Sequence, residues 1–315
     1  MIRLIQNEWM KISYRIGTWV MVGLLVLGMI ATLIFGITTN KEQASGDWKA
    51  ELQMMNAENK KTLKDEEGYF KRELERETAI NEYRIKHDLP PAEHFGKNAW
   101  TYVNSNAALL QLVGVFVIII ASTIVSAEYK HGTIKLLLIR PPSRLKVLIS
   151  KYITVQLYSL LLVAVLFVLS FILGAIFFGL NNDYVHLVYQ NGEVIERSHF
   201  VHMIYYYLAH CAMFVVLGTL SFAISTVFRS EAMSIAISVL FYVVGGSITA
   251  ILMFYFDWAK YLLFANDPSL YFSDPSMLTE GVTLGFSLIV LTIYWAIFLA
   301  IALLVFQKRE VKTGS

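Results

Sequence analysis

Six long runs of apolar residues, none containing Asp, Glu, Lys or Arg, constrain the fold of this 315-residue chain more than any other feature. Each exceeds the ~18 residues that indicate a membrane-spanning helix. The chain is 56% hydrophobic and 16% charged, whereas a soluble domain carries about 25% charged residues. The sequence therefore predicts an all-α integral membrane protein. The predicted spans are 17–37, 107–127, 152–178, 203–227, 232–256 and 284–306.

The basic residues between the spans are divided unevenly. Thirteen Lys and Arg fall in the amino-terminal arm, the 128–151 segment, the turn after the fourth span and the 307–315 tail, against two in segments 179–202 and 257–283. Short loops rich in Lys and Arg stay on the cytoplasmic side, while long loops translocate largely regardless of charge. We therefore expect a multi-pass protein of the cell membrane with both termini, and the 307–315 tail, in the cytoplasm.

Three segments outside the spans have structural character of their own. Residues 1–16 mix apolar and basic residues and predict a helix along the inner leaflet, the alternative being a basic flank that only sets topology. Residues 38–106 predict a large external insertion, with helix formers over about 49–88, a break near Gly68 and an end at Leu89-Pro90-Pro91. Its charges suit a solvated face better than a binding surface. Segment 257–283 is aromatic and broken by Pro, which favours short helices at the outer interface.

Small residues recur at the spacing that lets helices approach closely. Ser221 and Ser225 lie in the fourth span, and Ser234 and Ser238 in the fifth. Packing within the chain is favoured over a subunit interface.

Several kinds of chemistry are missing from the sequence. There is no G-x-x-x-x-G-K-[ST], H-E-x-x-H or C-x-x-C, and no span carries an acidic or basic residue. We expect no catalytic residues and no bound metal. His199 and His202 are three residues apart, and hydrogen-bonded or interfacial roles are favoured over metal ligation. The single Cys211 lies in an apolar run and suits burial. A net charge of +2 does not suggest nucleic acid as a partner.

The segment between the second and third spans, residues 128–151, stands apart because it holds six Lys or Arg and one acid. We call it the bridge. It is short, amphipathic and interrupted by Pro141-Pro142. Such a segment suits a membrane subunit on which a separate soluble motor acts, since the chain contains no motor of its own.

The bridge resembles that of ABC-2 type permeases, the membrane subunits of ABC exporters with the type V exporter fold. The resemblance covers the whole chain, including the amino-terminal helix and the turn Ser221–Ala232, although the long 38–106 insertion departs from the short first loop of the simplest members. The family's bridge has an acid, Gly-Thr, a Leu-rich stretch, Pro, Ser-Arg and a Lys entering the third span. In this chain these are Glu128, Gly132-Thr133, Leu136-Leu137-Leu138, Pro142, Ser143-Arg144 and Lys151.

The resemblance implies a permease driven by two copies of a separate cytoplasmic ABC ATPase, which would bind ATP and Mg, and paired with a second permease subunit that is identical or a sister. The bridge would be the coupling helix that docks on the ATPase, and residues 1–16 the connecting helix beside it. The candidate coupling residues are Glu128, Gly132, Thr133, Pro142 and Arg144. The connecting-helix candidates are Arg3, Trp9, Lys11 and Arg15.

Two of these candidates carry charges that we expect to be used. Glu128 and Arg144 could make charge-assisted contacts with the ATPase or with each other. The alternative for the basic residues of the bridge is anchoring to anionic lipid.

The expected function is ATP-driven export of a hydrophobic or amphipathic compound, such as a lipid-like molecule, a peptide antibiotic or a drug. This expectation rests on the absence of charge in the spans. The alternative is an ABC-type sensor or signalling module whose external insertion binds a ligand without net transport. A membrane enzyme is disfavoured because no cluster of acid, base and nucleophile faces the bilayer.

Overall fold

The computed structural model describes residues 1–39, 47–64, 68–91, 97–130, 143–180, 185–190, 192–228, 230–273 and 282–308. Within this part of the chain, six helices are long and apolar enough to cross a membrane. The bridge residues Gly132, Thr133 and Pro142 lie outside the described residues. The spanning helices are α2 (Ile16–Thr39), α5–η2–α6 (Ala99–Asn106, Ala107–Leu109, Leu110–Lys130), α8 (Arg144–Phe178), α9 (His199–Val227), α10 (Glu231–Tyr255) and α12 (Leu284–Lys308).

The second span begins earlier than the predicted 107–127. Asn98 forms a capping box with Thr101, so the helix starts at Ala99 and the candidate span runs from Ala99 to Glu128. Counting only uninterrupted apolar residues missed this start because Asn104, Ser105 and Asn106 are polar. Hydrogen bonds satisfy Asn106, which is fully buried: its amide donates to the carbonyl of Tyr102 and accepts from the hydroxyl of Thr32.

The third span also begins earlier than the predicted 152–178. Helix α8 starts at Arg144, directly after Ser143, so the last eight residues of the 128–151 bridge belong to the spanning helix. The prediction missed this start because charged Arg144, Lys146 and Lys151 interrupt the run of apolar residues. The fourth span, predicted at 203–227, gains His199–His202 as its first turn, while the other spans differ from prediction by at most two residues.

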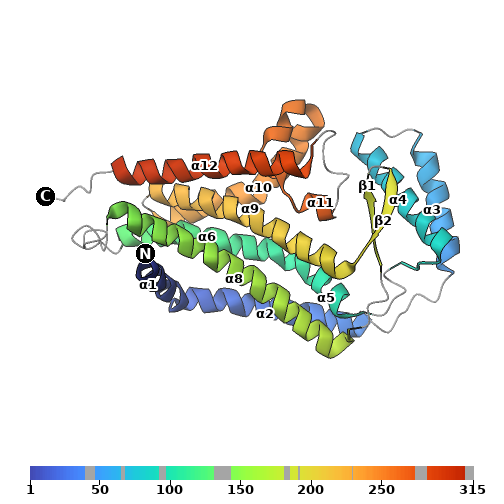
Figure 1. Cartoon of the computed structure of the whole chain (residues 1–315), viewed down its shortest axis with the longest axis horizontal. Helices are drawn as coiled ribbons and strands as arrows, with labels where there is room; N and C mark the ends of the chain where they lie inside the picture. The colour runs from blue at the N-terminus through green and yellow to red at the C-terminus, as the bar shows by residue number, and fades with distance from the viewer. Residues whose placement is uncertain are drawn as a thin grey trace.

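Two helices form the centre of the bundle. In the most apolar stretch of α6 and of α9, more than half of the residues are buried inside the protein. In each of the other four spans, less than a third of the corresponding residues are buried. Helix α9 packs against α6, α8, α10 and α12, and α2 and α12 lie on opposite sides of the bundle (Figure 1). We call the end that carries helix α1 (Ile2–Ser13) the α1 end, and the opposite end the hairpin end.

Serine side chains hold α6, α9 and α10 together. Ser225 donates to the carbonyl of Ser122 at 2.7 Å, and Ser122 lies 3.3 Å from the hydroxyl of Ser238. Ser221, Ser225, Ser234 and Ser238 are all at most 2% exposed. The close packing predicted from their spacing therefore lies within the chain, as the sequence favours.

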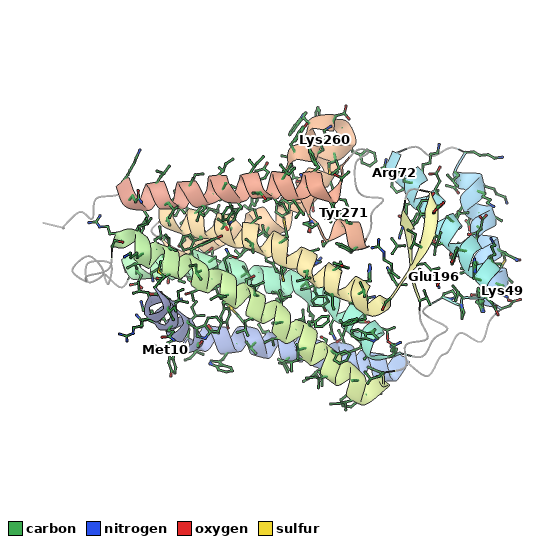
Figure 2. The ribbon with its side chains drawn as sticks, viewed as in Figure 1. Met10, Lys49, Arg72, Glu196, Lys260 and Tyr271 are labelled. Atoms are coloured by element: carbon green, nitrogen blue, oxygen red, sulfur yellow. The ribbon has the colours of Figure 1, made fainter. Side chains whose placement is uncertain are left out.

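The hairpin end carries the insertion. Helices α3 (Trp48–Thr62) and α4 (Gly68–His87) pack against each other, and Asn56 and Asn81 form a buried hydrogen bond between them. Two antiparallel strands, β1 (His186–Gln190) and β2 (Glu193–Arg197), contact α4 (Figure 1). Tyr83 donates to Glu196, which Figure 2 labels, at 3.2 Å.

The strand pair is a departure from the predicted all-α fold. Its signal was present in the sequence: Asn191-Gly192 separates two runs rich in Val, Tyr and Ile, and this dipeptide is typical of tight hairpins. Gly192 has φ +85, a conformation that favours glycine.

The predicted interfacial segment 257–283 contains short helices η3 (Asp257–Tyr261), η4 (Phe264–Asn266) and α11 (Leu270–Ser273). Asn266 fixes this segment to α12, because it is fully buried and accepts from Ser287 at 2.9 Å. Tyr271, labelled in Figure 2, lies 2.9 Å from the same hydroxyl. These contacts tie the connection between α10 and α12 to the bundle.

A close approach of α8 to α5 depends on a glycine. A Cβ on Gly174 would lie 2.8 Å from the Cα and 3.0 Å from the carbonyl oxygen of Ala99. Because both atoms belong to the backbone, the helices must move apart to accept a larger side chain.

We expect Gly174→Ala to lower the free energy of unfolding by about 1–3 kcal/mol, the range for overpacking a close contact. Gly246→Ala is the matched control, since a Cβ at this glycine of α10 meets nothing within 4 Å. Unfolding of the purified protein in detergent measures both. Equal stability of the two variants would contradict the close approach.

Candidate functional site

Helix α1 lies against the bundle with part of its surface buried and part exposed. Glu8 and Ile12 are buried, and α1 packs on the start of α8. Ile2 is 73% exposed, and Met10, labelled in Figure 2, is 49% exposed. A buried glutamate on such a short helix requires a charged partner.

Glu8 has two lysine partners, one on α1 itself and one on α8. Glu8 and Lys11 from α1, Glu128 from α6 and Lys151 from α8 form what we call the ionic cluster. Lys151 Nζ lies 2.7 Å from Glu8 and 2.9 Å from Glu128. Lys11 Nζ lies 3.0 Å from Glu8 and 2.9 Å from Glu128. Each lysine thus pairs with both carboxylates, and the cluster carries no net charge.

The chain path explains this meeting. Glu8 and Lys11 are one helical turn apart and share a face of α1. Helix α6 runs toward the α1 end and α8 starts there, so Glu128 and Lys151 face each other across the two ends of the bridge. The cluster is therefore the point at which α1 and both ends of the bridge are joined.

Burial makes these pairs costly to separate. The side chains of Lys151, Glu8 and Glu128 are 4%, 6% and 11% exposed, whereas Lys11 is 42% exposed. Removing one partner of a buried pair leaves an uncompensated charge, at a cost of about 3–5 kcal/mol. The cluster thus holds α1, α6 and α8 as one unit. Because every member already has a partner within the cluster, its role is to fix the positions of these helices.

The lysine at the edge of the cluster remains charged across the physiological range. Burial lowers the pKa of Lys11, but its hydrogen bonds and ion pairs with Glu128 and Glu8 outweigh this and hold the pKa above 10.5. Its stabilising contribution is complete below pH 10.5 and is lost only as the pH rises through the raised pKa.

Further contacts fix α1 on the bundle. Trp9 packs on Tyr158 of α8, with ring centroids 5.6 Å apart. Arg15 donates to Thr123 of α6 at 3.3 Å, and Arg3 is exposed. Three of the four residues predicted for a connecting helix, Trp9, Lys11 and Arg15, therefore contact α6 or α8.

The predicted coupling residues have different surroundings. Glu128 is buried with Lys11 and Lys151 as its partners, and Arg144 is exposed at the first position of α8. The sequence suggested that Glu128 could pair with Arg144; in the structure it pairs with Lys11 and Lys151. The sequence analysis did not predict the ion pair between Glu8 and Lys151. The only signal was that Glu8 is the one acidic residue among the basic residues of the amino-terminal arm.

Histidines gather at the hairpin end. The rings of His186 on β1 and His202 on α9 stack with centroids 3.7 Å apart, and the His199 ring lies 5.7 Å from His186. Burial, followed by the charges of the other two histidines and of Arg84 and Arg197, lowers the pKa of His186 to about 3. The neutral ring is therefore part of the contact between the strand pair and α9. In the described ranges, no three His, Cys, Asp or Glu side chains form a group that could hold a metal ion.

In the part of the chain that the structure describes, six helices are long and apolar enough to cross a bilayer, which is typical of a multi-pass membrane protein. The family described as "Protein of unknown function (DUF2705)" matches residues 90–312, and the chain belongs to this family. It is 41% identical to the uncharacterized protein YhcI of Bacillus subtilis (strain 168) over 99% of each chain. It is also 33% identical to the uncharacterized membrane protein YdbK of the same organism, over 67% of this chain and 82% of YdbK.

The ionic cluster predicts a large effect of Lys151→Met, because Glu8 and Glu128 then share one lysine. The free energy of unfolding should fall by about 3–5 kcal/mol. Exposed Lys146 lies on the same helix, and Lys146→Met should change it by at most ~0.5 kcal/mol. Denaturant titration of the purified protein compares them. Adding Glu8→Gln to Lys151→Met should recover part of the loss, and full additivity would argue against a shared cluster.

The histidines predict a pH effect at the other end of the molecule. With a folded pKa of about 3 against an ordinary 6.5, the contribution of His186 is complete above pH 6.5 and is lost as the pH falls toward 3. His186→Phe keeps the ring stack without the titration, so its melting temperature should fall less than that of the wild type between pH 7 and pH 4. His87→Phe, at an exposed histidine, serves as the control and should keep the wild-type slope. A slope for His186→Phe as steep as that of the wild type would argue against this assignment.

Proposed function

We propose that this protein is the permease subunit of an ABC exporter in the cell membrane, driven by two copies of a separate cytoplasmic ATPase and paired with a second permease subunit. The observation that carries the proposal is the ionic cluster, which joins both ends of the bridge to α1. The ABC-2 pattern of the bridge and the six spans support it. In this proposal the α1 end and both termini are cytoplasmic, and the hairpin end is external.

The cluster suits a coupling role because a permease must pass a push on its cytoplasmic side to several spans at once. A force on the bridge reaches α6 through Glu128 and α8 through Lys151. Since both residues also pair with α1, separating any of the three helices exposes a buried charge. The three helices would therefore move together when the ATPase closes, and the bundle would rock as a unit.

The lipid-facing helices suit an apolar or amphipathic cargo. The candidate spans α2, α10 and α12 expose large apolar side chains, and the described spans have few charges between their ends. A hydrophobic or amphipathic compound, such as a lipid-like molecule, a peptide antibiotic or a drug, would leave between the two permease subunits.

Purification of the tagged full-length chain from its native membrane tests the proposal. We expect a soluble ATPase with a Walker motif to co-purify. Arg144→Glu should lower its recovery by about tenfold, because reversing an exposed charge beside the docking segment replaces attraction with repulsion. Lys71→Glu, an exposed charge reversal on α4 at the hairpin end, should leave recovery unchanged.

Two results would count against the proposal. If no ATPase co-purifies with the wild type, the exporter assignment fails. If an ATPase co-purifies equally with wild type and both variants, the start of α8 is not part of the dock. An ATPase complex that moves no compound would favour the sensor alternative.

A further inference from the structure

The last span lies outside the ionic cluster, which joins only α1, α6 and α8. Figure 1 shows α8, α9 and α12 side by side, and α12 packs mainly on α9 with a smaller contact to α8. If the spans of the proposed permease move together, other contacts must connect α12 to the cluster.

One hydroxyl group makes this connection. Tyr152 directly follows Lys151 on α8, so the two side chains leave the helix about 100° apart around its axis. Trp295 Nε1 of α12 donates to the Tyr152 hydroxyl at 2.7 Å, and this hydroxyl lies 2.9 Å from Thr219 Oγ1 of α9. Lys151 therefore joins α8 to α1 and α6, while the next residue joins α8 to α9 and α12.

The surrounding contacts give this hydroxyl a defined direction. Thr219 donates its own hydrogen to the carbonyl of Val215 at 2.6 Å, so Tyr152 is the donor in its bond with Thr219. Gln156, one turn further along α8, donates to the same carbonyl at 3.3 Å. The Tyr152 ring packs on Phe222 of α9, with centroids 5.5 Å apart. The hydroxyl thus donates to α9 and accepts from α12.

The same network contains an acceptor without a donor. Within the part of the chain that the structure describes, Gln156 Oε1 is buried and has no hydrogen-bond partner, which is costly. Turning the amide over would bring this oxygen against the Val215 carbonyl oxygen. Tyr152 and Gln156 are four residues apart on one face of α8. A small displacement would let the Tyr152 hydroxyl donate to Gln156 instead of Thr219, so the network offers two arrangements, as a coupling element needs.

We propose that Tyr152 is a positioning residue that passes a displacement of the ionic cluster to α12. The inference rests on the proposed function, since it supplies the way in which a push on the bridge reaches the last span. Lys151 and Tyr152 belong to one helical turn and move together. Trp295 follows, because no water in the bilayer core can replace the partner of its indole N–H.

A second set of contacts leads from the cluster toward α12, and the test must separate the two. Glu128 lies on α6, where the carbonyl of Ser122 accepts from Ser225 of α9 at 2.7 Å, and α9 packs on α12. This serine connection reaches α12 only through α9, whereas Tyr152 bonds to Trp295 directly.

The indole N–H of Trp295 is the reporter in the test. The full-length protein, with isotope-labelled indole nitrogens in its six tryptophans, is studied by NMR in lipid nanodiscs, and Trp295→Phe identifies the reporter signal. Glu8→Gln removes one charge from the cluster. We expect this change to shift the signals of both Trp9, its neighbour on α1, and Trp295. In a Tyr152→Phe background, which keeps the ring but lacks the hydroxyl, Glu8→Gln should still shift Trp9 and no longer shift Trp295.

Three further variants separate coupling from general disturbance. Tyr294→Phe removes a hydroxyl beside the reporter that donates to the Tyr261 carbonyl, and it should keep the Trp295 response. Ser225→Ala breaks the serine connection and should keep the response as well. Lys11→Met disturbs the cluster at its more exposed edge. It should shift the Trp295 signal even if Glu8→Gln proves too unstable to study.

Two results would overturn the proposal. The first is a Trp295 response that survives Tyr152→Phe or is lost in Ser225→Ala. The second is a wild-type background in which a change in the cluster shifts Trp9 and leaves Trp295 unmoved. Either result would leave the Tyr152 hydroxyl as a packing contact only.

The outcome is independent of the ATPase, because no ATPase takes part in the NMR experiment. An ATPase that co-purifies, together with a silent Trp295, would refute only the role of Tyr152. A Trp295 response that depends on Tyr152, without any co-purifying ATPase, would support the connection and refute the exporter.

Discussion

The organisation of this protein depends on four charges that neutralise one another where water is largely excluded. A lysine from α8 and a lysine from α1 each pair with carboxylates from α1 and α6. In an apolar environment a charged group must find a partner or become neutral. Because the partners come from three separate helices, satisfying this requirement also fixes how those helices are placed. The remainder of the bundle relies on contacts between uncharged groups, such as the serine hydrogen bonds among α6, α9 and α10.

The two ends of the bundle solve the same problem in different ways. At the α1 end, charges are buried as complete pairs, which gives a rigid joint between the helices beside the bridge. At the hairpin end, buried Arg84 donates to the backbone carbonyl of Pro90 at 2.9 Å, and His186 stacks on the ring of His202. In the permease proposed above, this arrangement would place a stiff joint beside the ATPase.

Much of the fold followed from the sequence because hydrophobic length is a local property. The six spans, the break near Gly68 and the aromatic connection before the last span could all be read from composition along the chain. The starts of α5 and α8 could not, because polar Asn106 and charged Lys151 find partners on distant helices, Thr32 of α2 and Glu8 of α1. The ionic cluster could not be predicted for the same reason. Glu128 was a predicted coupling residue, but its partners Lys11 and Lys151 lie on other helices and are set by how α1, α6 and α8 pack. The strand pair was missed although its Asn-Gly signal is local.

The ionic cluster also sets an order for assembly during synthesis. Glu8 and Lys11 are made first and can pair with each other as soon as α1 forms, since they are three residues apart. Lys11 meets Glu128 only 117 residues later, and Lys151 follows after a further 23. Until the third span emerges from the ribosome, the amino-terminal helix carries a self-neutralised pair and Glu128 lacks its second lysine. The arrival of residue 151 therefore marks the moment at which the amino-terminal half of the protein closes, before any of the last three spans has been made.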